Sequence, residues 1–241
     1  MITTNKVLII GGSSGIGLEV ARHALLAGAQ VAIAGRSAQR LNSALERLES
    51  DRVEVFEADI GDAQQVKHLF SRVGALDHLV ITAAELAYGP VGELTESDLM
   101  KAVRSKFLGP VFAIQECALR IRPGGSITLT SGIAAQRPMI GGSVAAAMNS
   151  GLEGLGRAMA IELTPVRVNV ISPGWTDTPI WDGMPGMTSD SKLERFSAMA
   201  KRLPVGRIGR TEDIASAVMF LMSNGFVTGT VIHVDGGHQL V

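Results

Sequence analysis

The chain is poor in the residues that build disulfides, metal sites and highly charged surfaces. Its one cysteine, Cys117, excludes an internal disulfide framework and a zinc site made of cysteines. The five histidines are not clustered at metal-ligand spacing, so we expect no metal. A formal net charge of −1 provides no basic surface for nucleic acid or for an anionic membrane. No hydrophobic run is long enough to span a bilayer and no signal peptide is evident, which favours a cytoplasmic protein.

A regular alternation of short β-branched strands and longer helical patterns runs along the chain. Its 241 residues are 46% hydrophobic and 19% charged, which is typical of a globular protein with a sizeable core. The strand Val7–Ile10 precedes a helical pattern over Gly15–Leu26, and Val31–Ala34 precedes one over Ala38–Leu48. This pattern predicts an α/β fold, a doubly wound parallel sheet with helices on both faces in three layers. No linker interrupts it, so we expect a single domain over residues 1–241.

A glycine-rich turn follows the first strand and opens the first helix. Residues 10–17 read Ile-Gly-Gly-Ser-Ser-Gly-Ile-Gly. Glycines let the backbone approach a phosphate, and the helix N-terminus offers free N–H groups and the positive end of a dipole. The turn therefore predicts a site for the pyrophosphate of a dinucleotide. The residues expected to contact it are Gly11, Ser13, Ser14, Gly15, Ile16 and Gly17.

The residues after the second strand indicate which dinucleotide binds. An acidic residue at this point would hydrogen-bond the adenosine ribose hydroxyls and favour NAD, but Arg36 and Ser37 stand here instead. Arg36 offers a fork of donors suited to a 2′-phosphate, and Ser37 adds a hydroxyl, so NADP(H) is favoured. The alternative is that Arg36 caps a solvated corner of the protein or stacks on adenine.

Asp59 and Ile60 follow the third strand and are predicted to belong to the same site. At the carboxyl end of a strand, the Asp59 carboxylate is placed to accept a hydrogen bond from the adenine amino group. The alternative is an aspartate that only caps a helix or closes a turn, which is the commoner role for this residue type.

Residues 175–204 break the alternation of strands and helices. This stretch carries several prolines and glycines and then a short amphipathic piece over Lys192–Lys201. A long insertion late in a doubly wound fold usually covers the ligand crevice at the strand ends. We therefore predict a substrate-covering segment, the alternative being a loop that packs on its own domain. Its apolar residues include Trp175, Trp181, Met184, Met187, Phe196 and Met199.

Four segments of the chain resemble motifs of the short-chain dehydrogenase/reductase family. The glycine turn resembles that family's Thr-Gly-x-x-x-Gly-x-Gly, with Ile10 in place of the threonine. Asn169–Gly174 resembles its Asn-x-x-x-Pro-Gly, while Pro204–Gly209 and Val234–Gly237 resemble its C-terminal signatures. The resemblance covers nearly the full length and implies a Rossmann-type fold. It further implies contacts to the nicotinamide and diphosphate from Pro173, Gly174, Thr176 and Thr178.

The chain departs from this family where the family does its chemistry. The resemblance places the family's Tyr-x-x-x-Lys on a long helix predicted over Ser143–Leu163, with the register fixed by Glu162-Leu163. The family tyrosine protonates the alkoxide that forms as hydride arrives, helped by the lysine charge. Ala145 has no such proton, and the single tyrosine, Tyr88, follows the fourth strand instead. The tyrosine, lysine, serine and asparagine positions of the family fall on Ala145, Asn149, Gly132 and Lys106.

Other side chains offer a substitute for the missing proton donor. By the resemblance, Lys106 stands near the position of the lost ammonium, and a partly desolvated lysine acts as acid or base. Ser131 lies one residue before the serine position, and Asn149 keeps an amide that can hydrogen-bond a nicotinamide ribose hydroxyl. Glu85 is expected near the nicotinamide, where it holds a proton or pairs with Lys106. The alternatives are a solvated Lys106, a plain strand-end hydroxyl at Ser131 and a surface charge at Glu85.

Three functions are compatible with this pattern. The first is an NADP(H)-dependent oxidoreductase that acts on a small carbonyl or alcohol substrate with Lys106, Ser131 and Asn149 at its centre. The second is a catalytically silent NADP(H)-binding sensor, because several catalytic positions are substituted together. The third is a non-catalytic subunit that assembles with an active paralogue. The resemblance also implies a homodimer or homotetramer built on the helices over Ser97–Arg120 and Ser143–Leu163.

Overall fold

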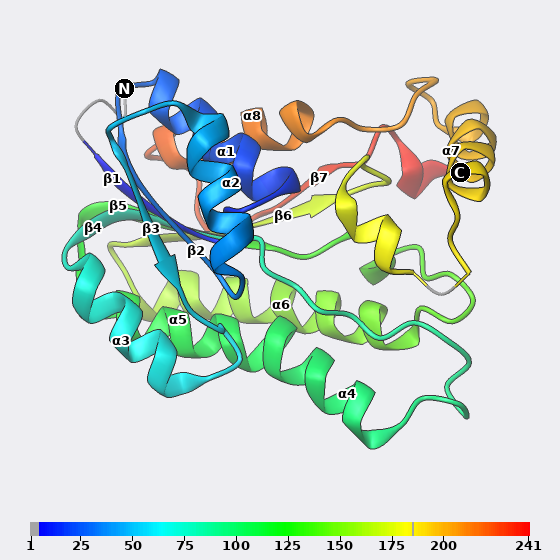
Figure 1. The fold of residues 1–241 in the computed structure, drawn as a ribbon, viewed down its shortest axis with the longest axis horizontal. Coiled ribbons are helices and arrows are strands. Elements are labelled where there is room, and N and C mark those ends of the chain that lie inside the picture. Colours follow the sequence, from blue (N-terminus) through cyan, green and yellow to red (C-terminus); the bar gives the residue numbers. More distant parts are fainter. Residues whose placement is uncertain (1–4, 185) are drawn as a thin grey trace.

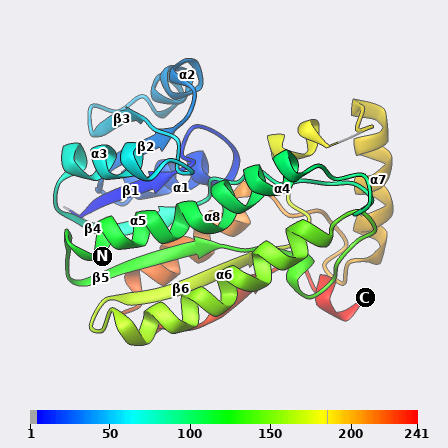
Figure 2. The ribbon, with the colours of Figure 1, turned by 90° about the horizontal axis from the view of Figure 1, so that it is seen from below.

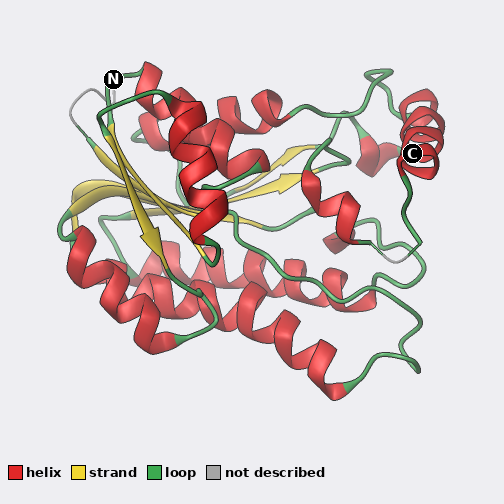
Figure 3. Ribbon diagram, in the orientation of Figure 1, coloured by secondary structure: helices red, strands yellow, loops and turns green. Residues whose placement is uncertain are grey.

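The computed structural model describes residues 5–184 and 186–241, which form one three-layer α/β domain (Figures 1 and 3). Strands in the described part of the chain make a seven-stranded parallel sheet in the order β3-β2-β1-β4-β5-β6-β7. The order reverses between β1 and β4, so a crevice opens there at the carboxyl ends of the strands. The strands are β1 Lys6–Ile10, β2 Gln30–Gly35, β3 Val53–Glu57, β4 Leu76–Ile81, β5 Ile121–Thr130, β6 Arg167–Pro173 and β7 Val231–Val234.

Helices cover both faces of the sheet, as Figures 1 and 2 show. One face carries α1 (Gly15–Leu26), α2 (Ala38–Leu48) and α8 (Thr211–Ser223). The opposite face carries α3 (Ala63–Val73), α5 (Gly109–Ala118) and α6 (Ser143–Glu162), with α4 (Glu96–Val103) continuing the line of α5. The predicted doubly wound parallel sheet is therefore confirmed.

Two hydrophobic cores lie on the two sides of the sheet. In β1 the buried Val7 and Ile9 pack with α1, α2 and α8, whereas Leu8 and Ile10 pack with α3, α5 and α6. This division follows from strand geometry, because successive side chains point to opposite faces. A strand buried on both faces reads as a continuous apolar run, which is why the sequence shows no alternation there.

A π-helical turn joins α4 to α5. This turn, η1, spans Arg104–Leu108 between α4 and α5, and Pro110 follows at the start of α5. A π-turn adds a residue to the helical repeat and is common at functional sites. Within η1 the side chains of Ser105 and Lys106 are buried rather than solvated.

The segment over residues 175–204 contains two helices at the carboxyl end of the sheet. They are the 3₁₀-helix η3 (Pro179–Gly183) and the α-helix α7 (Ser189–Arg202), which lies near the C-terminus in Figures 1 and 2. The rings of Trp175, Trp181 and Phe196 join them, with centroids 4.6 to 6.2 Å apart. Lys192 of α7 ties the segment together through ion pairs to Asp177 and Asp182 at 3.0 and 3.3 Å.

The described part of the chain contains no helix that is both long and apolar enough to cross a membrane. It also contains no cluster of three or more metal-ligating side chains.

Candidate functional site

A first cavity of about 480 Å³ opens at the carboxyl ends of β1, β2 and β4. Its wall includes the residues predicted from the glycine turn, namely Gly11, Ser13, Ser14, Gly15, Ile16 and Gly17. Arg36, Ser37, Ile60 and Thr178, which were also predicted to contact the cofactor, line this cavity as well. The topology explains this gathering, because β1 pairs with both β2 and β4 and their following turns meet at one point.

The glycine turn leaves no room for side chains at three of its positions, Gly11, Gly12 and Gly17. A Cβ on Gly11 would lie 2.5 Å from the backbone nitrogen of Ala83, and Gly11 has φ +97°. A Cβ on Gly17 would lie 2.3 Å from the carbonyl oxygen of Gly11. The Thr82 hydroxyl donates to that same oxygen at 3.2 Å, so β4 braces the turn of β1. Only glycine lets the turn pack this closely on itself and on the segment that follows β4.

The N-terminus of α1 faces the first cavity with unused polar groups. Ser14 is the N-cap residue, and its side chain makes no capping hydrogen bond within the described chain. The first N–H groups of a helix have no partner inside the helix, and they stand at the positive end of its dipole. The N-terminus of α1, with the Ser14 hydroxyl, therefore suits an anionic phosphate.

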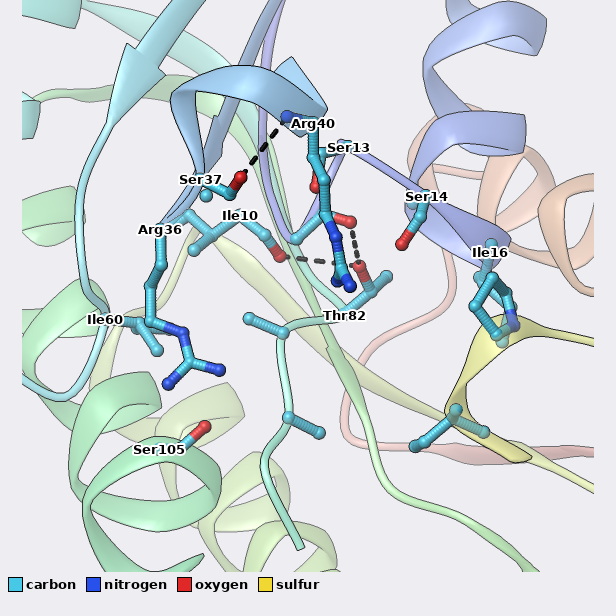
Figure 4. A pocket seen from close by; sticks show the side chains of 18 of the residues that line it. Ile10, Ser13, Ser14, Ile16, Arg36, Ser37, Arg40, Ile60, Thr82 and Ser105 are labelled. Carbon is cyan, nitrogen blue, oxygen red and sulfur yellow. Dashed lines mark hydrogen bonds between the residues drawn. The ribbon is translucent and has the colours of Figure 1, made fainter. Parts of the chain in front are cut away.

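Two arginines reach the first cavity from neighbouring elements. Arg36 follows β2, while Arg40 belongs to the first turn of α2 and was not predicted from the sequence. In Figure 4 the Arg40 side chain extends toward Thr82 and that of Arg36 toward Ser105. Ser37 caps α2, its Oγ accepting from the Arg40 backbone N–H at 3.3 Å, which leaves its own proton for a ligand. The sequence signal for Arg40 was a second arginine four residues after Arg36, in the first turn of the predicted helix.

Asp59 and Ile60 have different surroundings. Ile60 lines the first cavity, whereas Asp59 is absent from its wall. The Asp59 Oδ1 accepts from the backbone N–H of Gly61 at 2.8 Å, which is the turn-closing contact of an Asx turn. The turn interpretation of Asp59 therefore has a geometric basis.

A second cavity of about 170 Å³ lies beside the first. Five residues line both cavities, which makes them parts of one crevice: Ile16, Thr82, Ala84, Thr178 and Ile180. The second cavity brings together the predicted centre of Lys106, Ser131 and Asn149. Pro173, Gly174 and Thr176, which the family resemblance placed at the nicotinamide, line it as well.

Lys106 is the cation inside the second cavity. Only 4% of its surface is exposed, and its Nζ donates to the carbonyl oxygens of Thr130 at 2.7 Å and Ser131 at 3.4 Å. No described carboxylate forms an ion pair with it, and burial lowers the pKa of Lys106 to about 8. At that pKa the side chain holds a proton at neutral pH and releases it readily. The predicted pairing with Glu85 is wrong, because Glu85 pairs with Arg36 across the crevice rim.

Ser131 belongs to a buried polar cluster behind the second cavity. Its hydroxyl donates to Oε1 of Glu153 at 3.1 Å, and Gln136 Nε2 donates to both carboxylate oxygens at 2.9 Å. Glu153 lies on α6, one turn beyond Asn149, and was not predicted as a site residue. Because Ser131 directs its only proton to Glu153, its oxygen presents an acceptor to the cavity.

Asn149 fills the space that Gly132 leaves open. A Cβ on Gly132 would lie 3.0 Å from Asn149 Nδ2, so the two residues accommodate each other. Asn149 is 4% exposed, and its Oδ1 is buried without a hydrogen-bond partner in the described chain. A buried unpaired acceptor costs free energy, so a ligand donor such as a hydroxyl fits this position. Ala145, one turn earlier on α6, is buried and carries no polar group.

Tyr88 is the functional candidate that sequence reasoning set aside. It follows β4, yet it lines the second cavity together with Lys106 and Asn149. Burial raises the pKa of Tyr88, so the phenol stays neutral over the physiological range. The signal available in the sequence was that this is the only tyrosine of the chain. Trp175, Trp181 and Met184 of the segment over residues 175–204 complete the wall.

The fold and its crevice define the class as a dinucleotide-binding α/β protein. The family model described as enoyl-(acyl carrier protein) reductase matches residues 11–239. The short-chain dehydrogenase/reductase fsr5 of Gibberella fujikuroi is 33% identical over 98% of this chain and 95% of its own length. This chain belongs to the short-chain dehydrogenase/reductase family.

Solved structures agree with this assignment. The reductase/Diels-Alderase MalC of Malbranchea aurantiaca superposes with a TM-score of 0.92, at 32% identity over 100% of this chain and 98% of MalC. A small-chain dehydrogenase in complex with NADPH superposes with a TM-score of 0.82, at 35% identity over 99% of this chain and 100% of that protein.

Proposed function

We propose that this protein is an NADP(H)-dependent oxidoreductase of small carbonyl or alcohol substrates that uses a non-standard proton donor. The observation that carries the proposal is one crevice that holds both the glycine turn and the buried Lys106, which forms no ion pair with a described carboxylate. NADPH occupies a similar small-chain dehydrogenase, and MalC and the matching family model are both described as reductases. We likewise propose that residues 1–241 act as one unit, in the cytoplasm.

The first cavity fits NADP(H) on the chain's own geometry. The places where a Cβ would clash, Gly11 and Gly17, keep the backbone close enough to hold the diphosphate at the α1 N-terminus. Arg36, Ser37 and Arg40 supply donors for the 2′-phosphate. The other residues proposed to contact the cofactor are Ser13, Ser14, Gly15, Ile16, Asp59, Ile60, Asn149, Pro173, Gly174, Thr176 and Thr178.

The second cavity fits the reacting end of the complex. A nicotinamide held by the residues of this cavity would supply the hydride for carbonyl reduction, or accept it in the reverse direction. As the carbonyl double bond opens, Lys106 Nζ gives a proton to the developing alkoxide, which its charge also stabilises. The low pKa, about 8, favours this transfer because a free lysine near 10.5 gives up its proton less readily.

Asn149 and Ser131 serve this reaction without supplying protons. The unpaired Asn149 Oδ1 accepts from a nicotinamide ribose hydroxyl and so orients the ring. Ser131 anchors the end of β5 to Glu153 and thereby fixes the carbonyl oxygens that hold Lys106 in place. The absence of tyrosine and lysine from α6, over Ser143–Glu162, makes the chain an atypical family member in this proposal.

The segment over residues 175–204 covers the substrate in this proposal. Trp175, Trp181 and Met184 give the second cavity apolar walls that exclude water around the reacting carbonyl. The helices over Ser97–Arg120 (α4 to α5) and Ser143–Leu163 (α6) are proposed to form the contact between protomers of a homodimer or homotetramer.

The test separates binding from turnover. NADPH is titrated by fluorescence, and its oxidation is then followed at 340 nm with a panel of aldehydes, ketones and quinones. We expect saturable binding, turnover of at least one substrate class and loss of that turnover in Lys106→Met. Binding without turnover of any substrate, with Lys106→Met behaving like the unmodified protein, would favour the catalytically silent sensor instead.

A further inference from the structure

An ion pair spans the rim of the first cavity. Arg36 Nη1 donates to Glu85 Oε2, which joins the residue after β2 to the segment after β4. The two side chains are 56% and 38% exposed, so the pair is open to solvent and to an incoming ligand. Figure 4 shows the Arg36 side chain directed from the β2 end of the cavity toward Ser105.

The backbone that carries Glu85 is anchored to two neighbouring segments. The Glu85 N–H donates to the Oγ of Ser105 at 2.9 Å, and Ser105 is a buried residue of η1. Two residues earlier, the Ala83 N–H donates to the carbonyl oxygen of Ile10 at 3.0 Å. Glu85 itself does not line the first cavity, but Ser105, Ala83 and its partner Arg36 do, so its carboxylate acts on the cavity through Arg36.

A second cation in the same cavity has no such partner. Arg40 lines the first cavity and forms no ion pair with a residue of the described chain. Its backbone N–H donates to Ser37 Oγ at 3.3 Å, which places its side chain one turn into α2, next to the capping serine. A 2′-phosphate therefore meets one guanidinium that is already paired and one that is available.

We propose that Glu85 is a specificity-determining residue that weakens the preference of this chain for a 2′-phosphate by competing for Arg36. The phosphate has to displace the carboxylate from Arg36 and then lies near its negative charge, whereas a ribose 2′-hydroxyl meets no such repulsion. Arg40 supplies the cation that reads the phosphate. This inference deepens the proposed function and rests on it for the orientation of the nucleotide.

The test uses two fragments that carry no nicotinamide, adenosine 2′,5′-bisphosphate and AMP, each titrated calorimetrically. We expect Glu85→Gln to tighten the bisphosphate about three- to tenfold, because an exposed ion pair is weak but its carboxylate also repels the phosphate. AMP binding is expected to change less than twofold. Arg40→Gln is expected to weaken the bisphosphate about tenfold and to leave AMP unaffected.

Glu57→Gln is the matched control. Glu57 is exposed at the end of β3, in register with Gly35, and forms no ion pair with Arg36. The Glu57→Gln substitution removes one negative charge near the same cavity. It therefore measures the effect of net charge on bisphosphate binding without any change at the Arg36 ion pair. An equal gain in Glu57→Gln, or an unchanged or weaker bisphosphate affinity in Glu85→Gln, would overturn the proposal. Adding Arg36→Gln to Glu85→Gln is expected to abolish the gain.

The outcome is separable from that of the proposed function. If Glu85→Gln binds the bisphosphate more tightly, and AMP unchanged, but the protein does not turn over NADPH, the specificity role is supported and the enzyme is not. Turnover of NADPH, with bisphosphate affinity unchanged in Glu85→Gln, supports the enzyme and counts against the specificity role. Failure of both fragments to bind the unmodified protein overturns both assignments.

Discussion

Replacing Lys106 by methionine tests the proposed donor and its energetic cost together. Burial lowers the pKa of Lys106 to about 8 from 10.5. At about 1.36 kcal/mol per pKa unit, the buried charge costs the folded protein about 3 kcal/mol at pH 7. Methionine has a similar length and avoids this cost, but it loses the hydrogen bonds to the carbonyls of Thr130 and Ser131, at about 1 kcal/mol each. We therefore expect Lys106→Met to gain about 1 to 2 kcal/mol of stability at pH 7.

The sign of this gain depends on pH. The folded-state pKa of Lys106 is lowered, so its cost is fully present below about pH 8 and fades as pH rises toward 10.5. Above that range only the lost hydrogen bonds remain, and Lys106→Met becomes the less stable protein. Urea unfolding at several pH values measures both limits.

The same substitution is expected to remove most of the activity. Loss of a general acid lowers kcat/KM for carbonyl reduction by about 100- to 10,000-fold, while the Kd for NADPH changes less than twofold. In the unmodified protein, reduction should decline above about pH 8 as Lys106 loses its proton. Lys101→Met, at an exposed lysine of α4, is the control and should change neither property. A Lys106→Met protein that is less stable but equally active would refute the reasoning.

Three further predictions follow from the same geometry. Gly17→Ala places a methyl 2.3 Å from the Gly11 carbonyl oxygen and should raise the NADPH Kd at least about tenfold in fluorescence titrations. The control Gly154→Ala, with open space at its Cβ, should instead raise the free energy of unfolding by about 0.5 to 1 kcal/mol. Burial lowers the pKa of His78 to about 4, so about 3 kcal/mol of stability present above pH 6.5 is lost as pH falls toward 4, and His78→Gln should flatten that slope in urea unfolding. Tyr88→Phe should raise the substrate KM and lower kcat less than about tenfold, and a loss of kcat larger than in Lys106→Met would transfer the donor role to Tyr88.

Local signals predicted much of the fold. The helix α1 begins and ends as expected at Gly15 and Leu26, because a glycine turn opens it and an apolar face runs through it. The strand β5 begins at Ile121, before residues that disfavour a strand. Pro123 and Gly124 lie within it and disfavour a strand by propensity, but Ile121 pairs with Leu76 on β4 across a register shift. Pairing between distant segments overrides propensity at that point.

In the candidate site, too, locally encoded features were predictable from the sequence and contacts between distant segments were not. Its glycine turn was recognisable because a positive φ, such as the +97° of Gly11, is a local backbone conformation that favours glycine. The partner of Arg36 was not, because Glu85 is 49 positions away and meets it only at the sheet's carboxyl edge. Tyr88 and Glu153 were missed for the same reason.

The sequence by itself determined the class of ligand and the layered α/β architecture, since backbone conformation and hydrophobic periodicity are encoded over a few adjacent residues. Only the tertiary structure decided that Lys106 is buried beside Asn149 and that Arg36 is already paired at the crevice rim. The physical reason is that burial and charge partners depend on which strand ends become neighbours. That is fixed by the packing of the whole sheet and not by any one segment.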